Sequence, residues 1–441
     1  MGTLFRIILL GMVLAGCATP DPRVLQRSLE AGDCASAPLL LEQEKGKYGG
    51  NSELLFLMDA GMVHLQCGNY GLAQEQFREA EQLAEALWTK SLSRNAASFL
   101  TSDYLLKYPG EDYERVMIHL MSAMGYLQSG ELDEALVECR LLDSLLGLYN
   151  TKYEKKNVYK EDAFARYLSG ILNEDDGELD AAFIDYLLAA RAYIDYNEDY
   201  GTPMPESLQE DLLRTGVTVD RLEDAEAVLK NFPGRQWTTQ TGTGAEGKIV
   251  YIQFSGNAPE KVEDRVYIPT RRGPVTIAFP RMVMAPPTCG GGRLVLRSGA
   301  AVIESDLELV EDINRIALKN LDDRKGRVIA KTVARAVAKQ VVIAGLSSQG
   351  DDDMQATIAT VLNLINMAVE RADTRSWRTL PGEIYMTRIF VPPGVYTLGV
   401  SGCGEPRQDL RTLRIESGHT RYVLHDSRYG LPKSVSNGQR H

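Results

Sequence analysis

The clearest candidate for nucleotide chemistry is the glycine-rich stretch from Gly242 to Lys248. Its spacing satisfies both a dinucleotide-binding GxGxxG and a phosphate-binding GxxxxGK pattern. Such a loop binds phosphate when it follows a strand and opens a helix, because the backbone N–H groups of the helix N-terminus then face the anion. This stretch instead precedes a predicted strand, and Ile249 stands where a phosphate loop has Ser or Thr. We therefore expect no nucleotide here.

Other reactive side chains lack the spacing that catalysis or metal binding needs. The sequence has no HExxH, GxSxG or CxxC, His425 and Asp426 form an isolated pair, and the acidic run at Glu174 lacks calcium-loop spacing. His64 and His119 stand at predicted apolar-face positions without a partner at metal-ligand spacing. We predict no catalytic residue, no metal and no cofactor. A pair of glycosidase carboxylates stays open, because their separation depends on tertiary structure.

The first residues have the features of an export signal. Arg6 precedes an apolar run over residues 7–13, and Leu-Ala-Gly-Cys follows with its cysteine at position 17. This sequence resembles the lipobox of bacterial lipoproteins, which implies a signal peptide at 1–16 and a diacylglycerol on Cys17. Cleavage without lipidation is the alternative. Ala18 in place of Asp implies anchoring in the outer membrane, and we expect the periplasmic face. Each methylene of the lipid that is buried in the bilayer contributes ~0.8 kcal/mol to membrane binding.

The composition is that of an exported globular protein with two oppositely charged halves. Its 441 residues are 44% hydrophobic and 24% charged, which argues against collagen-like or disordered chains. Residues 17–235 carry 20 basic and 39 acidic side chains, a net charge of −19, and residues 236–441 carry 27 and 21, a net charge of +6. Either the halves dock on each other, or the basic half meets an anionic partner such as lipid headgroups. We expect no nucleic acid outside the cytosol.

The five cysteines beyond the signal peptide can form disulfides outside the cytosol. We predict Cys34 with Cys67, in neighbouring helical hairpins, and Cys289 with Cys403, in the second half, as the pairs to test. Buried free thiols are the alternative for each pair. The odd number leaves at least one cysteine unpaired.

A repeated spacing organises the N-terminal half. A turn glycine is followed by a large residue two positions on, an alanine five on and an apolar residue nine on, with a weaker copy at Gly32. A small residue stands seven positions before each strong turn, as at Gly61 and Gly170, where a second helix could cross closely. The spacing resembles tetratricopeptide repeats, in which glycines separate paired helices and alanines permit close packing. The residues concerned are Gly68, Tyr70, Ala73 and Phe77, then Gly130, Leu132 and Ala135, then Gly177, Leu179 and Ala182.

We predict an α+β protein: an all-α tetratricopeptide-like repeat domain at 17–235, a linker at 236–247, a β-rich, sandwich-like domain at 248–430, and a flexible tail at 431–441. Alternating apolar residues predict strands. They fall at 248–254, 262–268, 275–279, 293–297, 384–391, 395–400, 410–415 and 420–424. A helical insertion at 306–372 separates the two strand groups, with helices at 306–321, 324–345 and 352–372.

The middle helix of this insertion carries a cationic stripe. Arg327, Lys331, Arg335 and Lys339 recur every four residues beside an Ala and Val face. A solvated surface is the common meaning of such a stripe. Contact with anionic lipid or with the acidic repeat half is the alternative.

Helical repeats bind extended peptides or partner helices in a concave groove. Tyrosines such as Tyr193 and Tyr196 could line one, although helix packing is their commoner role. Segments at 89–94, 110–119, 162–170 and 372–381 resemble an uncharacterised family of bacterial envelope lipoproteins with repeat-containing N-terminal halves. The resemblance implies an envelope lipoprotein. We expect a lipid-anchored scaffold that binds envelope proteins, in cell-envelope or cell-wall assembly. The alternatives are an envelope enzyme acting on glycan or peptide, and a structural component of a secretion or surface-assembly complex.

Overall fold

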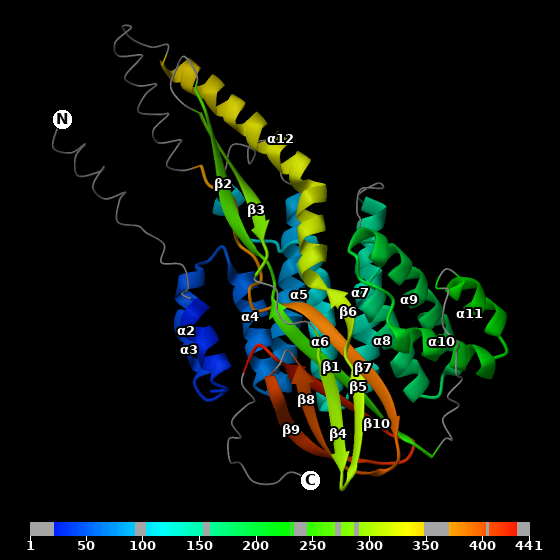
Figure 1. The fold of residues 1–441 in the computed structure, drawn as a ribbon. Coiled ribbons are helices and arrows are strands. Elements are labelled where there is room, and N and C mark those ends of the chain that lie inside the picture. Colours follow the sequence, from blue (N-terminus) through cyan, green and yellow to red (C-terminus); the bar gives the residue numbers. More distant parts are fainter. Residues whose placement is uncertain are drawn as a thin grey trace.

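The computed structural model describes residues 22–92, 103–152, 159–230, 232, 245–269, 275–285, 291–347, 370–402 and 405–429. Helices occupy the N-terminal half, and a β-rich half follows (Figure 1). This arrangement confirms the predicted α+β class. Cys17, Cys289, Cys403, the tail at 431–441 and nearly all of the linker at 236–247 lie outside the described residues.

The helices of the first half run in antiparallel pairs joined by short turns. Gly68, Gly130 and Gly177 occupy these turns with φ of 72°, 82° and 85°, a left-handed backbone that glycine adopts without steric cost. The helices are α2 (Pro22–Glu30), α3 (Ala37–Tyr48), α4 (Glu53–Gln66), α5 (Tyr70–Leu92), α6 (Asp112–Ser129), α7 (Leu132–Lys152), α8 (Ala163–Asp175), α9 (Leu179–Asp199), α10 (Glu206–Thr218) and α11 (Leu222–Leu229).

Small residues let the paired helices approach closely. A Cβ built on Gly61 of α4 would lie 2.3 Å from the ring of Phe77 in α5, and one on Gly170 of α8 would lie 2.3 Å from the ring of Tyr186 in α9. The predicted packing alanines, Ala73, Ala135 and Ala182, are fully buried. Tyr70, Leu132 and Leu179 are only half-buried at the starts of their helices.

The strands form two four-stranded sheets and one hairpin. The first sheet has the order β10-β1-β7-β6, in which β1 pairs with β10 in parallel and with β7 antiparallel. The second sheet has the order β5-β4-β8-β9. Among the described residues, β2 and β3 pair only with each other. The strands are β1 (Gly247–Asn257), β2 (Glu260–Ile268), β3 (Val275–Val283), β4 (Arg293–Ser298), β5 (Ala301–Asp306), β6 (Glu308–Asp312), β7 (Pro381–Val391), β8 (Gly394–Gly402), β9 (Glu405–Ile415) and β10 (Thr420–Asp426).

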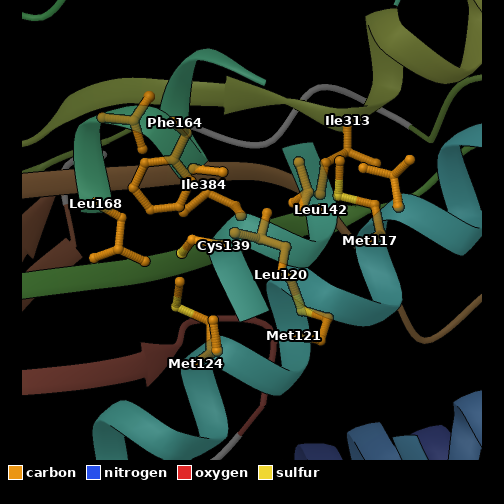
Figure 2. Packing of buried hydrophobic residues seen from close by; sticks show 14 of the residues in the cluster. Met117, Leu120, Met121, Met124, Cys139, Leu142, Phe164, Leu168, Ile313 and Ile384 are labelled. Atoms are coloured by element: carbon orange, nitrogen blue, oxygen red, sulfur yellow. The ribbon is translucent and has the colours of Figure 1, made fainter. Parts of the chain in front are cut away.

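The first sheet lies between the helices and the second sheet. Alternate residues of β1 point to opposite sides: Val250 and Ile252 pack into the helical core, whereas Ile249 and Tyr251 pack against the second sheet. Such a strand is buried on both faces. Figure 2 shows the helical side of this core, where Ile384 of β7 lies among side chains of α6, α7 and α8 such as Phe164.

All eight predicted strands are present, but the predicted helix at 306–321 begins too early. Residues 301–306 and 308–312 form β5 and β6, and one continuous helix, α12 (Ile313–Ser347), replaces the two helices predicted at 306–321 and 324–345. Most of the helix predicted at 352–372 lies outside the described residues, and residues 370–372 are not helical.

Candidate functional site

The two oppositely charged halves dock on each other through buried ion pairs. Arg388 of β7, whose side chain is 1% exposed, lies 2.8 Å from Asp211 and 3.0 Å from Glu174 of the helical half. Arg214 of α10 contacts the same two carboxylates at 2.6 and 2.7 Å. Burial alone would raise the pKa of Glu174, but the two guanidiniums outweigh it and hold that pKa well below its usual range. The charge asymmetry therefore serves docking between the halves.

A second buried cluster joins the halves at the start of α6. Glu111, the N-cap residue of this helix, forms ion pairs with Lys261 of β2 and Arg324 of α12. Burial raises the pKa of Glu111, and the two cations outweigh that effect and lower it to about 2. Nearby, Glu114 accepts a hydrogen bond of 2.7 Å from the backbone N–H of Trp377, which is itself fully buried.

The inner side of the helical layer is covered by the first sheet, so among the described residues it offers no open groove. The tyrosines considered as groove-lining residues serve this packing. Tyr193 donates a hydrogen bond of 2.9 Å to the carbonyl of Val310, and Tyr196 donates to Glu311 of β6. A binding surface on the helical half therefore lies either on its outer face or at its α2–α4 end, where the helices meet the β2–β3 hairpin.

His64 and His119, the two histidines tested for metal-ligand spacing in the sequence, take part in helix packing. His119 is buried, and its Nδ1 lies 2.8 Å from Oε2 of Glu138. His64 is half-buried on α4, where burial lowers its pKa. In the part of the chain that the structure describes, no group of three or more His, Cys, Asp or Glu residues is placed to hold a metal ion.

The cationic stripe of α12 is largely neutralised within the chain. Arg335 and Lys339 lie 3.3 and 2.5 Å from the carboxylate of Glu370, and Arg335 is 2% exposed. Lys331 is exposed, and the side chain of Arg327 lies outside the described residues. The prediction of a solvated stripe is wrong for Arg335, because Glu370, distant in sequence, folds back onto the helix.

The outer part of α12 and the β2–β3 hairpin together project from the body of the molecule (Figure 1). We call residues 324–347 of α12 and this hairpin the arm. On α12 the arm buries Thr332 and Arg335, whereas Val337 and Val341 are 58% and 67% exposed. Proteins generally bury apolar side chains and expose charged ones, and this part of α12 reverses that preference.

The outer face of α7 carries a second exposed apolar row. Val137, Leu141 and Leu148 are each about two-fifths exposed and follow one side of the helix at spacings of four and seven. The exposed Asp133 and Glu134 border this row at its N-terminal end, and the exposed Arg140 lies beside Leu141. The row is an apolar surface with acidic side chains at one end, on the half that carries most of the negative charge.

A cavity of about 890 Å³ opens where α2, α3 and α4 meet the foot of the β2–β3 hairpin and the segment at 374–379. Its walls are largely apolar, with leucines from three helices and Met284 beside β3. Its volume falls in the range of about 300–1,000 Å³ that is usual for ligand sites. The apolar side chains that line it are Leu25, Leu29, Leu41, Leu55, Leu105, Val262, Val283 and Met284.

Polar side chains along one part of this cavity form a hydrogen-bonded chain. Asp59 accepts hydrogen bonds of 2.7 Å from both Tyr48 and Thr379, and Thr379 accepts one of 3.0 Å from the indole N–H of Trp377. Ser376 differs from these groups: it lines the cavity, is 5% exposed, and its hydroxyl has no hydrogen-bond partner among the described residues. Arg378, also on the wall, is well exposed and 4.0 Å from Glu260.

A disulfide braces the helices beside the cavity. Cys34, between α2 and α3, is bonded to Cys67 at the end of α4. Cys139 is a buried free thiol in α7. The bond fixes α2 and α3, which carry part of the cavity wall, to the end of α4.

Comparison with protein-family models, with curated proteins and with solved structures finds no match for this chain. Within the described residues, no helix has the length and apolar character needed to cross a membrane. The functional argument therefore depends on the sequence patterns and on the geometry of the arm, the α7 row and the cavity.

Sequence patterns predicted only part of these features. The spacing of the stripe located the basic side chains of α12, and the heptad-like spacing of apolar residues in α7 is visible in the sequence. The cavity combines helices near the start of the chain with residues 257–262, 283–285 and 374–379. No local pattern links these segments, so sequence reasoning missed Ser376 and Arg378.

Proposed function

We propose that this protein is a lipid-anchored scaffold of the bacterial envelope, held at the periplasmic face of the outer membrane by acyl chains on Cys17. In this proposal its helices are a divergent tetratricopeptide-like array, and its two four-stranded sheets form a sandwich. Its role is assembly with other envelope proteins rather than catalysis. The lipobox-like sequence before Cys17 supports the anchor, and the regular glycine turns with their buried alanines support the repeat assignment.

The observation that carries the scaffold proposal is the reversed burial on the arm. Arg335 is turned inward to Glu370, while Val333, Val337 and Val341 face outward along one side of α12. Of the six basic side chains in residues 324–347, Arg324, Arg335 and Lys339 pair with Glu111 or Glu370, and Lys325 and Lys331 are exposed. The surface that fits this arm is therefore apolar and bordered by carboxylates.

The outer face of α7 has that chemistry, and a second copy of the chain supplies it. The apolar row of Val137, Leu141 and Leu148 complements the valine row of the arm, and Asp133 and Glu134 complement the exposed Lys325 and Lys331 of α12. Contact between two different surfaces of identical chains is heterologous, so repeated contacts close into a ring or extend into a filament. Such self-assembly on a membrane favours the structural-component role among the functions considered.

The contact is tested by cysteine crosslinking between two full-length proteins in which Cys289 and Cys403 are replaced by Ser. One protein carries Val337→Cys and the other carries Leu141→Cys. Oxidation of the mixture should give a disulfide-linked mixed dimer. Its yield should exceed that of the dimer that either protein forms with itself when it is oxidised alone. The matched control replaces the α7 position by Val217→Cys, an exposed valine on α10.

Docking of the arm on α7 would be rejected if Leu141→Cys and Val217→Cys gave equal yields of mixed dimer. It would also be rejected if the only product joined two copies of the Val337→Cys protein. The anchor is tested separately by the mass of the N-terminal peptide from membranes of the producing bacterium. An acylated Cys17 supports the lipoprotein assignment. A peptide cleaved there without lipid overturns it and leaves the arm experiment unaffected.

A further inference from the structure

The cavity between α2–α4 and the segment at 374–379 has the features of an amphiphile site. Leucines from α2, α3 and α4 supply an apolar wall, and Val283 and Met284 continue it across the foot of the hairpin. Polar groups line it on 374–379 and on Asn51 and Asp59, and also on α3 and near the start of β2, where Glu44, Lys47 and Glu260 lie. A ligand that fills it must have a long apolar part and a compact polar part.

The unpartnered hydroxyl of Ser376 indicates where the polar part lies. A buried hydroxyl without a hydrogen bond is destabilising, so a ligand oxygen that accepts from it is stabilising. The hydroxyls of Tyr48 and Thr379 already donate to the neighbouring carboxylate of Asp59, so neither is available to donate to a ligand. Arg378 adds a positive charge on the same wall, which favours an anionic or ester oxygen.

We propose that this cavity binds an acyl chain, with the carbonyl or carboxylate oxygen of the ligand accepting a hydrogen bond from Ser376 beside Arg378. The chain itself lies along Leu25, Leu29 and Leu41, where burial of its methylenes is stabilising. Either a free fatty acid or one of the acyl chains on Cys17 supplies this chemistry. The second source rests on the proposed lipid anchor.

Its own lipid is within reach of the cavity. Cys17 is five residues before Pro22, where α2 begins, and five extended residues span at most about 17 Å. Leu25 and Leu29 of that same helix line the cavity. A lipoprotein that holds one of its acyl chains internally would be anchored by fewer chains, and its hold on the membrane would weaken accordingly.

The test titrates dansyl-labelled undecanoic acid into full-length protein carrying Cys17→Ala, which cannot be acylated at that position. We expect one saturable site per chain. Gly46→Trp should weaken binding at least tenfold, because Gly46 lines the cavity and a side chain there meets open space. Gly147→Trp in α7 is the matched control, since it also meets open space but lies outside the cavity.

Ser376→Ala and Arg378→Gln locate the polar end. Both should weaken the labelled acid several-fold, and Arg378→Gln should weaken its methyl ester less than the acid. No saturable binding to the Cys17→Ala protein, or equal binding by the Gly46→Trp and Gly147→Trp proteins, would overturn the proposal.

Acylated protein extracted from membranes distinguishes the two sources. If the lipid on Cys17 fills the cavity, the acylated protein should not bind the probe until that lipid is removed. If the acylated protein binds the probe as well as the Cys17→Ala protein does, the site is assigned to free acyl chains. If mass spectrometry finds no lipid on Cys17, the anchor fails while the titration of the Cys17→Ala protein still tests the cavity.

Discussion

Nη1 of Arg388 in β7 lies 2.8 Å from Oδ2 of Asp211 in α10, and both side chains are almost completely buried. This contact joins the basic half of the chain to the acidic half at the point where Glu174 and Arg214 also meet. Four charged groups are thus removed from water together, and each depends on the others for compensation.

Arg388→Met should destabilise the protein by about 3–5 kcal/mol, because Glu174 and Asp211 then stay buried with less positive charge nearby. Urea unfolding of the full-length protein measures this loss. Lys107→Met is the control: its ion pair with Glu53 is exposed on both sides and should contribute no more than about 0.5 kcal/mol. A loss for Arg388→Met as small as that of the control would contradict the role given to the buried cluster.

Gly61→Ala should destabilise the helical half by about 1–3 kcal/mol, because its Cβ would lie 2.3 Å from the ring of Phe77 and force that ring to move. Gly147→Ala in α7 adds a Cβ that meets nothing within 4 Å and should stabilise the protein by about 0.8 kcal/mol. Thermal unfolding of both variants gives the comparison. Equal effects in the same direction would show that helix propensity, and not close crossing, decides these positions.

Glu111 should make the protein less stable in acid. Its pKa is about 2 in the folded protein against 4.5 for a free glutamate, so the folded state favours the ionised form. The stabilisation from its pairs with Lys261 and Arg324 is complete above pH 4.5 and is lost as the pH falls through 2. Glu111→Gln should flatten the part of the stability curve between these values, measured by urea unfolding at each pH. An unchanged slope would assign the acid sensitivity to other carboxylates.

Asp143 should have the opposite pH dependence. Burial raises its pKa to about 7, although Arg166 lies 2.8 Å away and opposes the shift. The folded state therefore holds a proton that the unfolded chain releases near pH 3.8, and stability falls as the pH rises from about 4 to about 7. Asp143→Asn should remove this fall. Identical curves for the variant and the parent between pH 4 and 7 would rule the residue out as its source.

The sequence predicted the elements more successfully than their contacts. Strand alternation identified eight strands, most of which have a buried face, although β2 has none over residues 262–268. Residues 306–312 were mistaken for helix because Leu307, Val310, Ile313 and Ala317 are buried at spacings of three and four. A β-bulge between Leu309 and Glu311 shifts the strand period there and produces the helical spacing.

The functional surfaces depend on partners distant in the sequence. Arg335 was predicted to be a surface residue because no acidic side chain lies near it in α12, yet Glu370 covers it. The alternation of Val333 and Val337 with basic residues gave no sign of which side faces outward. The position of the β2–β3 hairpin determines which valines of the arm are exposed. The path of the segment at 374–379 leaves Ser376 without a hydrogen-bond partner among the described residues.

The parallel pairing of β1 with β10 has a consequence for synthesis on the ribosome. The helices emerge first, and the apolar side that Met117 and Phe164 share with the first sheet stays uncovered until β1, β7 and finally β10 have left the exit tunnel. Completion of the layered core therefore waits for residues 420–426, which follow the other strands of the first sheet in the sequence. A nascent chain stalled before them would present a wide apolar surface to chaperones and proteases, so quality control can recognise an incomplete copy by that uncovered face.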